Sequence, residues 1–196
     1  FGANLKFINS SIQRFSSTAI ASDFSLLYFN PEKPFVFTLV ARNVGTQLKS
    51  FETVTEKLPF KVAFGASYQL QYVPLKWYAT FDNLQKWDLS VPNPSNQTVD
   101  LNGNVTNEEI SFVNNLFRHV IIGAELFPKS AINLRIGYNF RRAAELKLQN
   151  VRTFSGFSFG FGLKMKKLKL NYAYSKFHSA TNASTFSLLI DLDNVR

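Results

Sequence analysis

The sequence predicts an all-β protein, namely a transmembrane antiparallel up-and-down β-barrel with about ten strands in residues 1–196. Three observations predict this fold. Apolar residues recur with a period of two, the alternating segments are long enough to cross a bilayer, and the links between them alternate in length. The chain contains 21 Phe and no Cys, so no disulfide framework supports it. We expect one outer-membrane barrel domain over 1–196 that lacks its N-terminal strands.

Four segments show the alternation most clearly. In 157–165 every odd position is apolar, while the even positions hold glycine, serine or lysine. The same pattern covers 60–72, 132–140 and 186–192. Because successive side chains of a strand point to opposite faces, this period predicts strands with one apolar face and one small or polar face.

Weaker copies of the pattern complete the set. They cover 1–8, 18–28, 34–44, 75–87, 118–126 and 168–177. The predicted strands reach about thirteen residues, whereas strands of globular proteins average about five or six. A tilted strand that crosses a bilayer needs about nine to eleven residues. The lengths therefore favour a membrane barrel over a sandwich.

The links give a separate indication, because barrels of this class have short periplasmic turns and longer outer loops. The short links are 29–33, 73–74, 127–129 and 166–167. The long links are 9–17, 45–59, 88–117, 141–155 and 178–185. If the last strand descends to the periplasm, every long link faces outside.

Charge and hydropathy narrow the class of protein. A mean hydropathy of -0.07, without a long apolar run, argues against membrane-spanning helices. The net charge of +9 suits nucleic acid, an anionic membrane or an acidic glycolipid. Nucleic-acid binding needs stacking aromatics on a basic face, but the aromatics here share a face with aliphatics. We therefore expect no nucleic-acid partner.

Candidate chemical groups are few. Neither histidine has a metal-ligand spacing, and no cysteine is present to complete a site. His178-Ser179 is a hydrolase-like pair, although a plain loop explains it as well. Glu108 and Glu109 suggest a calcium loop, but the spacing of an EF-hand is missing. We expect no enzyme activity, no catalytic or metal-binding residues and no cofactor.

The basic residues divide into two groups. Lys61, Arg135 and Lys164 fall on the small or polar faces, where a hydrated lumen would spare the cost of a cation facing lipid. A second group surrounds the tight turn at 166–167, and for it either phosphate binding or simple solvation is open.

Partner docking is expected at the outer loops, above all at 88–117, which has no regular pattern. Its apolar end either contacts a partner or folds back over the barrel mouth. The docking candidates are Trp87, Asp88, Phe112, Leu116, Phe117, Arg141 and Arg142.

Five stretches together resemble a known family. They are Ala41–Leu48, Leu58–Phe60, Asn83–Asp88, Arg135–Arg142 with Glu145-Leu146, and Gly156–Gly162. In order and spacing they are similar to the PorQ family, the outer-membrane barrel proteins of the type IX secretion system of the Bacteroidota. Each stretch alone is common among barrels, but the match runs along nearly the whole chain.

This resemblance implies a fourteen-stranded barrel related to the long-chain fatty-acid transporters, of which residues 1–196 would be roughly the last ten strands. It implies an anchor in the bacterial outer membrane that holds PorZ beside PorU and PorV, where cargo is joined to anionic lipopolysaccharide. Two alternatives stay open: an outer-membrane transporter or channel for hydrophobic or small solutes, and a soluble lipid-binding β-protein.

Overall fold

A computed structural model describes residues 1–12, 15–50, 56–89, 97–106, 111–146, 154–176 and 181–191. The chain divides into two compact units. Unit 1 comprises Phe1–Ala66 and Phe81–Trp87, and unit 2 comprises Ser67–Thr80 and Asp88–Arg196. Each unit is described by itself below.

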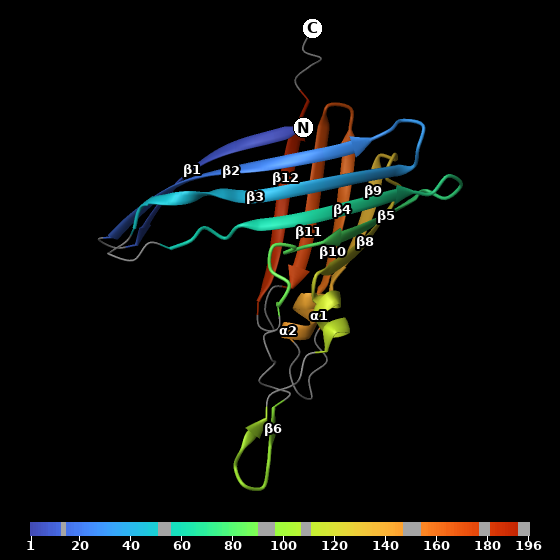
Figure 1. Ribbon diagram of the computed structural model, residues 1–196. Helices are drawn as coiled ribbons and strands as arrows, with labels where there is room; N and C mark the ends of the chain where they lie inside the picture. The colour runs from blue at the N-terminus through green and yellow to red at the C-terminus, as the bar shows by residue number, and fades with distance from the viewer. Residues whose placement is uncertain are drawn as a thin grey trace. The chain divides into compact units, whose positions relative to one another are not determined.

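The main element is a ten-stranded antiparallel sheet whose order follows the chain (Figure 1). Its strands are β1 (Gly2–Ile12), β2 (Phe15–Phe29), β3 (Phe35–Lys49), β4 (Lys61–Gln69), β5 (Leu75–Phe81), β8 (Val120–Leu126), β9 (Ile132–Asn139), β10 (Phe157–Met165), β11 (Leu168–Lys176) and β12 (Asn182–Ile190). The all-β, up-and-down fold is therefore confirmed. The strand order has two ends, because β1 is paired with β2 alone and β12 with β11 alone in the described residues.

In unit 1 the β2–β3 pairing is interrupted where two residues of β3 oppose one residue of β2. Ser22 pairs with Val44 and Phe24 with Ala41, so Asp23 faces a bulge that contains Asn43. Asn43 has a positive φ of 56°. Its backbone N–H donates to Asp23 Oδ1 at 2.9 Å, and Lys6 Nζ lies 2.6 Å from Asp23 Oδ2. We call Lys6, Asp23 and Asn43 the bulge cluster, which holds the bulge in place.

In unit 2 the register of β8 to β12 separates two unlike faces. Leu134 pairs with Phe161, which pairs with Tyr172, which in turn pairs with Phe186. On the other face Arg135 pairs with Gly160 and Asn133 with Gly162. The alternation read from the sequence therefore gives a continuous apolar face and a small or polar one, as predicted.

Burial in the described residues is inverted relative to a water-soluble protein. Large apolar side chains of β9, β10 and β12 are exposed, including Ile136 at 46%, Phe159 at 49% and Phe186 at 71%. The buried apolar residues are Ala19, Ala21 and Leu89. The buried polar residues are Ser17, Asn83, Asn115, Arg118, His119, Glu125, Asn133 and Ser155. Exposed apolar surface of this extent marks an interaction with a partner or a membrane.

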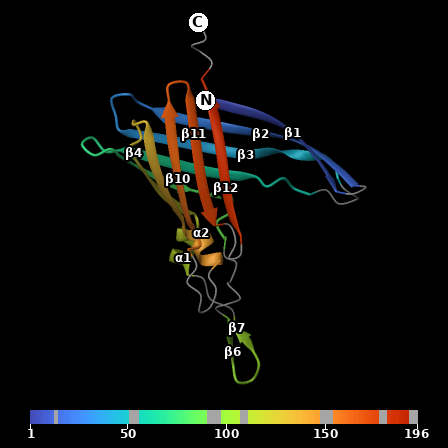
Figure 2. The same cartoon turned by 180° about the vertical axis from the view of Figure 1, so that it is seen from behind.

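Two short helices and a hairpin occupy the connections of unit 2. Helix α1 (Phe112–Arg118) precedes β8, and helix α2 (Phe140–Glu145) follows β9. Strands β6 (Thr98–Val99) and β7 (Val105–Thr106) form the hairpin. Figures 1 and 2 show both helices at one end of β8 to β10, opposite the tight turns. Neither described helix has the length and apolar character needed to cross a bilayer.

Several predicted boundaries are wrong. The link predicted at 9–17 belongs mostly to strands, because Asn9 pairs with Thr18 and Ser10 with Ser17. Serine and threonine pair through their backbone although they break the apolar pattern. The link predicted at 178–185 is shortened at its far end, because β12 begins at Asn182.

The strands predicted at 60–72 and 75–87 are shorter than expected. β4 ends at Gln69, and β5 ends at Phe81. Asn83, two residues after β5, has a positive φ of 57°, which lies outside the β region. The link predicted at 88–117, whose sequence shows no regular pattern, contains the hairpin and most of α1.

Candidate functional site

Helix α1 is short and is stabilised by a side-chain cap at its N-terminus. The side chain of Ser111 accepts a hydrogen bond from the backbone N–H of Asn114 at 3.3 Å, which satisfies one free donor of the first turn. The backbone N–H of Leu89 donates to Asn115 Oδ1 at 3.2 Å, and both residues are buried. These contacts fix α1 against the chain that leads out of β5.

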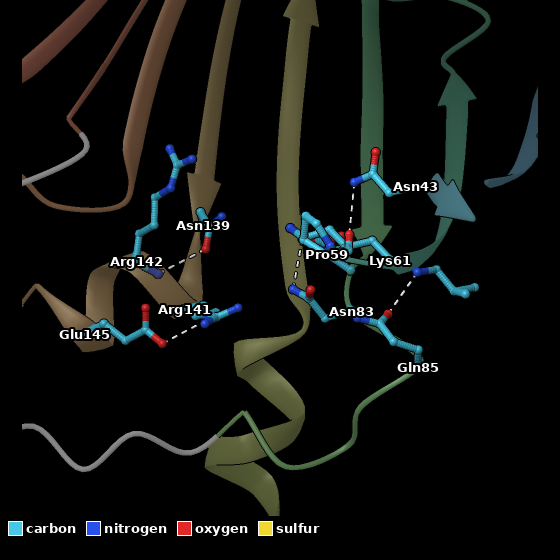
Figure 3. A network of polar contacts seen from close by, with 11 residues as sticks. Asn43, Pro59, Lys61, Asn83, Gln85, Asn139, Arg141, Arg142 and Glu145 are labelled. Atoms are coloured by element: carbon cyan, nitrogen blue, oxygen red, sulfur yellow. Dashed lines mark hydrogen bonds and ion pairs between the residues drawn. The ribbon is translucent and has the colours of Figure 1, made fainter. Parts of the chain in front are cut away.

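Helix α2 has a similar cap. Asn139, the last residue of β9, accepts a hydrogen bond from the N–H of Arg142 at 3.0 Å. Along the helix Arg141 Nε lies 2.8 Å from Glu145 Oε1, an i,i+4 ion pair (Figure 3). Side chains at this spacing are neighbours on one helix face. Arg141 is therefore held by its own helix, while Arg142 contributes a backbone contact.

An aromatic chain joins the two helices to the apolar face of the sheet. The rings of Phe117 and Phe140 are 5.3 Å apart, those of Phe140 and Tyr138 are 4.8 Å apart, and those of Tyr138 and Phe157 are 4.7 Å apart. Phe112 is 67% exposed, and Leu116 and Phe117 are partly exposed. We call Phe112, Leu116 and Phe117 with α2 the helix platform.

The structure brings most docking candidates of unit 2 together. Phe117 packs on α2, which carries Arg141 and Arg142. Asp88 is exposed and precedes Leu89, which is bonded to α1. Trp87 belongs to unit 1 and is half-exposed. The docking role of these seven residues stays a prediction. His178-Ser179 and Glu108-Glu109 lie outside the described residues.

A second site lies on the polar face of unit 2. Tyr78 of β5 donates its hydroxyl hydrogen to Glu125 Oε2 of β8 at 2.5 Å. Arg135 Nε of β9 donates to Glu125 Oε1 at 3.1 Å, and its Nη1 donates to Asn171 Oδ1 of β11 at 3.3 Å. We call Tyr78, Glu125, Arg135 and Asn171 the cavity cluster, because the first three line a cavity of about 760 Å³.

Glycine on β10 makes the cavity cluster possible. Arg135 on β9 and Asn171 on β11 are separated by β10, whose residues paired with these two are Gly160 and Gly162. A Cβ at Gly162 would lie 2.6 Å from Asn133 Oδ1, and one at Gly160 would lie 2.8 Å from the backbone oxygen of Tyr172. The missing side chains leave room for the guanidinium to cross β10.

The sequence indicated part of the cavity cluster. Arg135 was expected on a polar face, and its pairing with Gly160 opposite Glu125 confirms that face. Glu125, Tyr78 and Asn171 were missed. The available signal was Glu125 itself, a lone acid between Ala124 and Leu126 in an otherwise apolar strand. A charge there requires a buried partner.

In the cavity cluster the carboxylate of Glu125 is held between Tyr78 and Arg135. Glu125 accepts from two donors at once, so its carboxylate is occupied. In the described residues, no group of three or more His, Cys, Asp or Glu is placed to hold a metal ion. What the arrangement offers is a polar, positively charged recess beside a fixed ion pair.

Comparison with known proteins identifies no relative of this chain. The chain matches no family model, no curated protein and no solved structure. The fold and the sites therefore define a class only: an all-β protein with a ten-stranded up-and-down antiparallel sheet.

Proposed function

We propose that this chain forms part of the wall of an outer-membrane β-barrel and that its helix platform anchors a cell-surface protein assembly. The observation that carries the proposal is the inverted burial. The aromatic and aliphatic face of the sheet is exposed, while Glu125 and Asn133 are buried. This arrangement suits a barrel whose outer face contacts hydrocarbon and whose lumen is polar. The bilayer would cover the apolar face of β9 to β12.

The cost of charge in lipid supports the same orientation. Arg135 and Lys164 both lie on the polar face, in register with Gly160 and Lys169. A Lys or Arg that faced lipid at the midplane would cost roughly 2–4 kcal/mol. In the paired rows of β8 to β11, the apolar face from Leu134 to Tyr172 carries no such residue.

The anchor role rests on the resemblance to the PorQ family together with the helix platform. A fourteen-stranded barrel with PorZ, PorU and PorV as partners, next to anionic lipopolysaccharide, is what that resemblance implies. The platform supports it, because Phe112 and Leu116 are exposed aromatic and aliphatic side chains at the end that bears the long connections. Aromatic side chains of this kind are enriched at protein interfaces.

Cysteine accessibility tests the membrane orientation. The 196 residues contain no Cys. Labelling of the single variants Phe159→Cys and Ser158→Cys in the full-length protein can therefore be compared with labelling of the parent protein. In isolated membranes we expect a lipid-soluble maleimide to label Phe159→Cys and a water-soluble one to label Ser158→Cys. Equal labelling of Phe159→Cys and Ser158→Cys by the water-soluble reagent would contradict the proposal.

Co-purification tests the anchor role. A double variant, Phe112→Asp with Leu116→Asp, should lose its surface partner after detergent extraction. Leu101→Asp is the matched control, because Leu101 is fully exposed in the hairpin and lies outside the platform. A full-length barrel isolated as a stable monomer, with no partner under crosslinking, would overturn the anchor role while leaving the barrel intact.

A transporter or channel is the second candidate function. The cavity of about 760 Å³ on the polar face favours it, because a charged recess within a barrel wall can line a solute path. Uptake of a hydrophobic or small solute into liposomes should then depend on the protein. Absence of any protein-dependent uptake would exclude this candidate.

A further inference from the structure

The cavity of unit 2 has an unbalanced charge. Four cationic side chains, those of Lys76, Lys129, Arg135 and Lys169, are among its lining residues. Glu125 is the one acid in the described lining, and Arg135 already pairs with it at 3.1 Å. The remaining charge comes from three lysines. An electropositive recess of this kind raises the local concentration of anions.

Two of these lysines have unused binding capacity. Lys76 Nζ lies over the ring of Tyr78, 5.2 Å from its centroid. Lys129 and Lys169, in contrast, form no ion pair within the part of the chain that the structure describes. Lys169 also pairs across the strands with Lys164 on the same face. Like charges directly opposite each other are destabilising, so an anion bound at Lys169 relieves the repulsion.

Asn133 is the third group with unused capacity. It lines the same cavity, is 4% exposed, and its Oδ1 has no hydrogen-bond partner among the residues that the structure describes. Gly162 lies directly beside this amide, so no neighbouring side chain takes the place of a partner. A buried acceptor left unpaired costs free energy and requires an explanation such as a ligand or an ordered water. The missing partner is a hydrogen-bond donor.

The three groups lie at one end of the unit. Lys129 belongs to the turn between β8 and β9, and Lys169 is the second residue of β11, after the turn from β10. Asn133 is the second residue of β9 and pairs with Gly162, which pairs with Asn171. Figures 1 and 2 show the two turns at the end opposite the helices. The end of the cavity therefore offers two cations beside one acceptor.

We propose that this end of the cavity binds a phosphorylated sugar, whose phosphate lies between Lys129 and Lys169 while a sugar hydroxyl donates to Asn133 Oδ1. A phosphate oxygen accepts charge-assisted hydrogen bonds from both ammonium groups, and the hydroxyl supplies the donor that Asn133 lacks. Neither inorganic phosphate nor a neutral sugar satisfies both halves of the site. The inference rests on the cavity alone, so it stands or fails separately from the anchor role.

The binding test uses the full-length protein in detergent and isothermal titration calorimetry. The probes are glucose 6-phosphate, inorganic phosphate and glucose. Glucose 6-phosphate should bind saturably, inorganic phosphate about tenfold more weakly, and glucose not measurably. The proposal fails if glucose 6-phosphate shows no saturable binding, or if glucose binds equally well.

Three variants separate the two halves of the site. Lys129→Gln and Lys169→Gln should each raise the Kd for glucose 6-phosphate about tenfold. Asn133→Leu should reduce the affinity for glucose 6-phosphate until it equals the affinity for inorganic phosphate. The affinity for inorganic phosphate should not change. Lys33→Gln, an exposed residue of unit 1, removes the same charge and should change nothing. Unchanged affinity in both lysine variants would overturn the assignment even if one of the other variants fails to fold.

A free sugar phosphate and the phosphorylated sugar of a glycolipid share this chemistry. Phosphatidylcholine vesicles with and without a phosphorylated glycolipid distinguish the two sources. Binding to the glycolipid vesicles that glucose 6-phosphate displaces identifies a lipid headgroup as the ligand. Binding of glucose 6-phosphate with no preference for the glycolipid vesicles identifies the free sugar phosphate.

Discussion

The bulge cluster of unit 1 and the cavity cluster of unit 2 are built from similar side chains, but they differ in how completely their polar groups are paired. In the bulge cluster Lys6 Nζ contacts Asp23 and Asn43, and Asn43 Nδ2 donates to the backbone oxygen of Pro59 at 2.9 Å (Figure 3). Every polar side-chain atom of the three residues has a partner. Beside the cavity cluster, Asn133 Oδ1 has none.

This difference separates a structural cluster from a binding site. A complete set of hydrogen bonds fixes one backbone conformation, here the bulge at Asn43, and leaves nothing for a ligand. The cavity cluster fixes Arg135 and Glu125 in the same way. Beside it, among the described residues, Lys129 and Lys169 form no ion pair and Asn133 Oδ1 has no hydrogen-bond partner. Incomplete pairing next to an open volume is therefore the more informative observation about function.

The largest effect is expected at the bulge. Asn43→Val places a β-branched residue at a φ of 56° and removes the two hydrogen bonds of the Asn43 side chain, so the free energy of unfolding should fall by about 3 kcal/mol. Asn43→Gly keeps the conformation and should lose only about 1 kcal/mol. Urea titration of the protein in lipid vesicles measures both. Equal losses in the two variants would show that the conformation is not strained.

The cavity cluster should respond through its partners. Glu125→Leu leaves Arg135 Nε and the Tyr78 hydroxyl without their carboxylate partner and should cost about 2 kcal/mol, less than a fully buried pair because the Arg135 side chain is 37% exposed. The double variant Glu125→Leu with Arg135→Leu should recover more than half of that loss, as measured in the same urea titration. Additive losses would mean that the pair is not coupled.

A smaller effect is expected from crowding Asn133. Gly162→Ala puts a methyl group 2.6 Å from Asn133 Oδ1, so the amide must turn and the free energy of unfolding should fall by about 1 kcal/mol. Gly123→Ala is the matched control, since a Cβ at Gly123 would lie 3.3 Å from its nearest neighbour, a backbone oxygen. Thermal unfolding compares the two. If Gly123→Ala is the less stable variant, the close approach at Gly162 is not the cause.

The smallest effect belongs to the partly exposed ion pair of α2. Arg141→Ala should lower stability by about 0.3–0.5 kcal/mol, because an i,i+4 surface pair gains little in water. The loss should vanish in 1 M salt, where screening acts over about 3 Å. Unfolding in low and high salt checks this. A loss independent of salt would point to packing of the Arg141 stem instead.

The strands and their faces could be predicted from the sequence because a period of two is local. Residues 157–165 reveal their two faces without knowledge of any neighbour. The ends of β1 and β2 could not, since Ser10 and Ser17 pair through backbone groups that every sequence possesses. Strand ends that depend on pairing leave no compositional signal.

The candidate sites show the same division. Arg135 was placed on the polar face by its parity, but its pairing with Glu125 depends on the register between β8 and β9, which a single strand does not encode. Helices α1 and α2 are too short to show helical periodicity. They depend on caps at Ser111 and Asn139 and on packing between Phe117 and Phe140.

The pairing of β5 with β8 has a consequence for the order in which unit 2 folds. Consecutive strands such as β10 and β11 meet across a two-residue turn, whereas β5 and β8 are separated by residues 82–119. Closing so long a loop costs chain entropy before any hydrogen bond forms. In the folded chain the contact between Leu89 and Asn115 spans most of that loop. A buried asparagine outside the sheet thereby ties together the two ends of the longest link between paired strands.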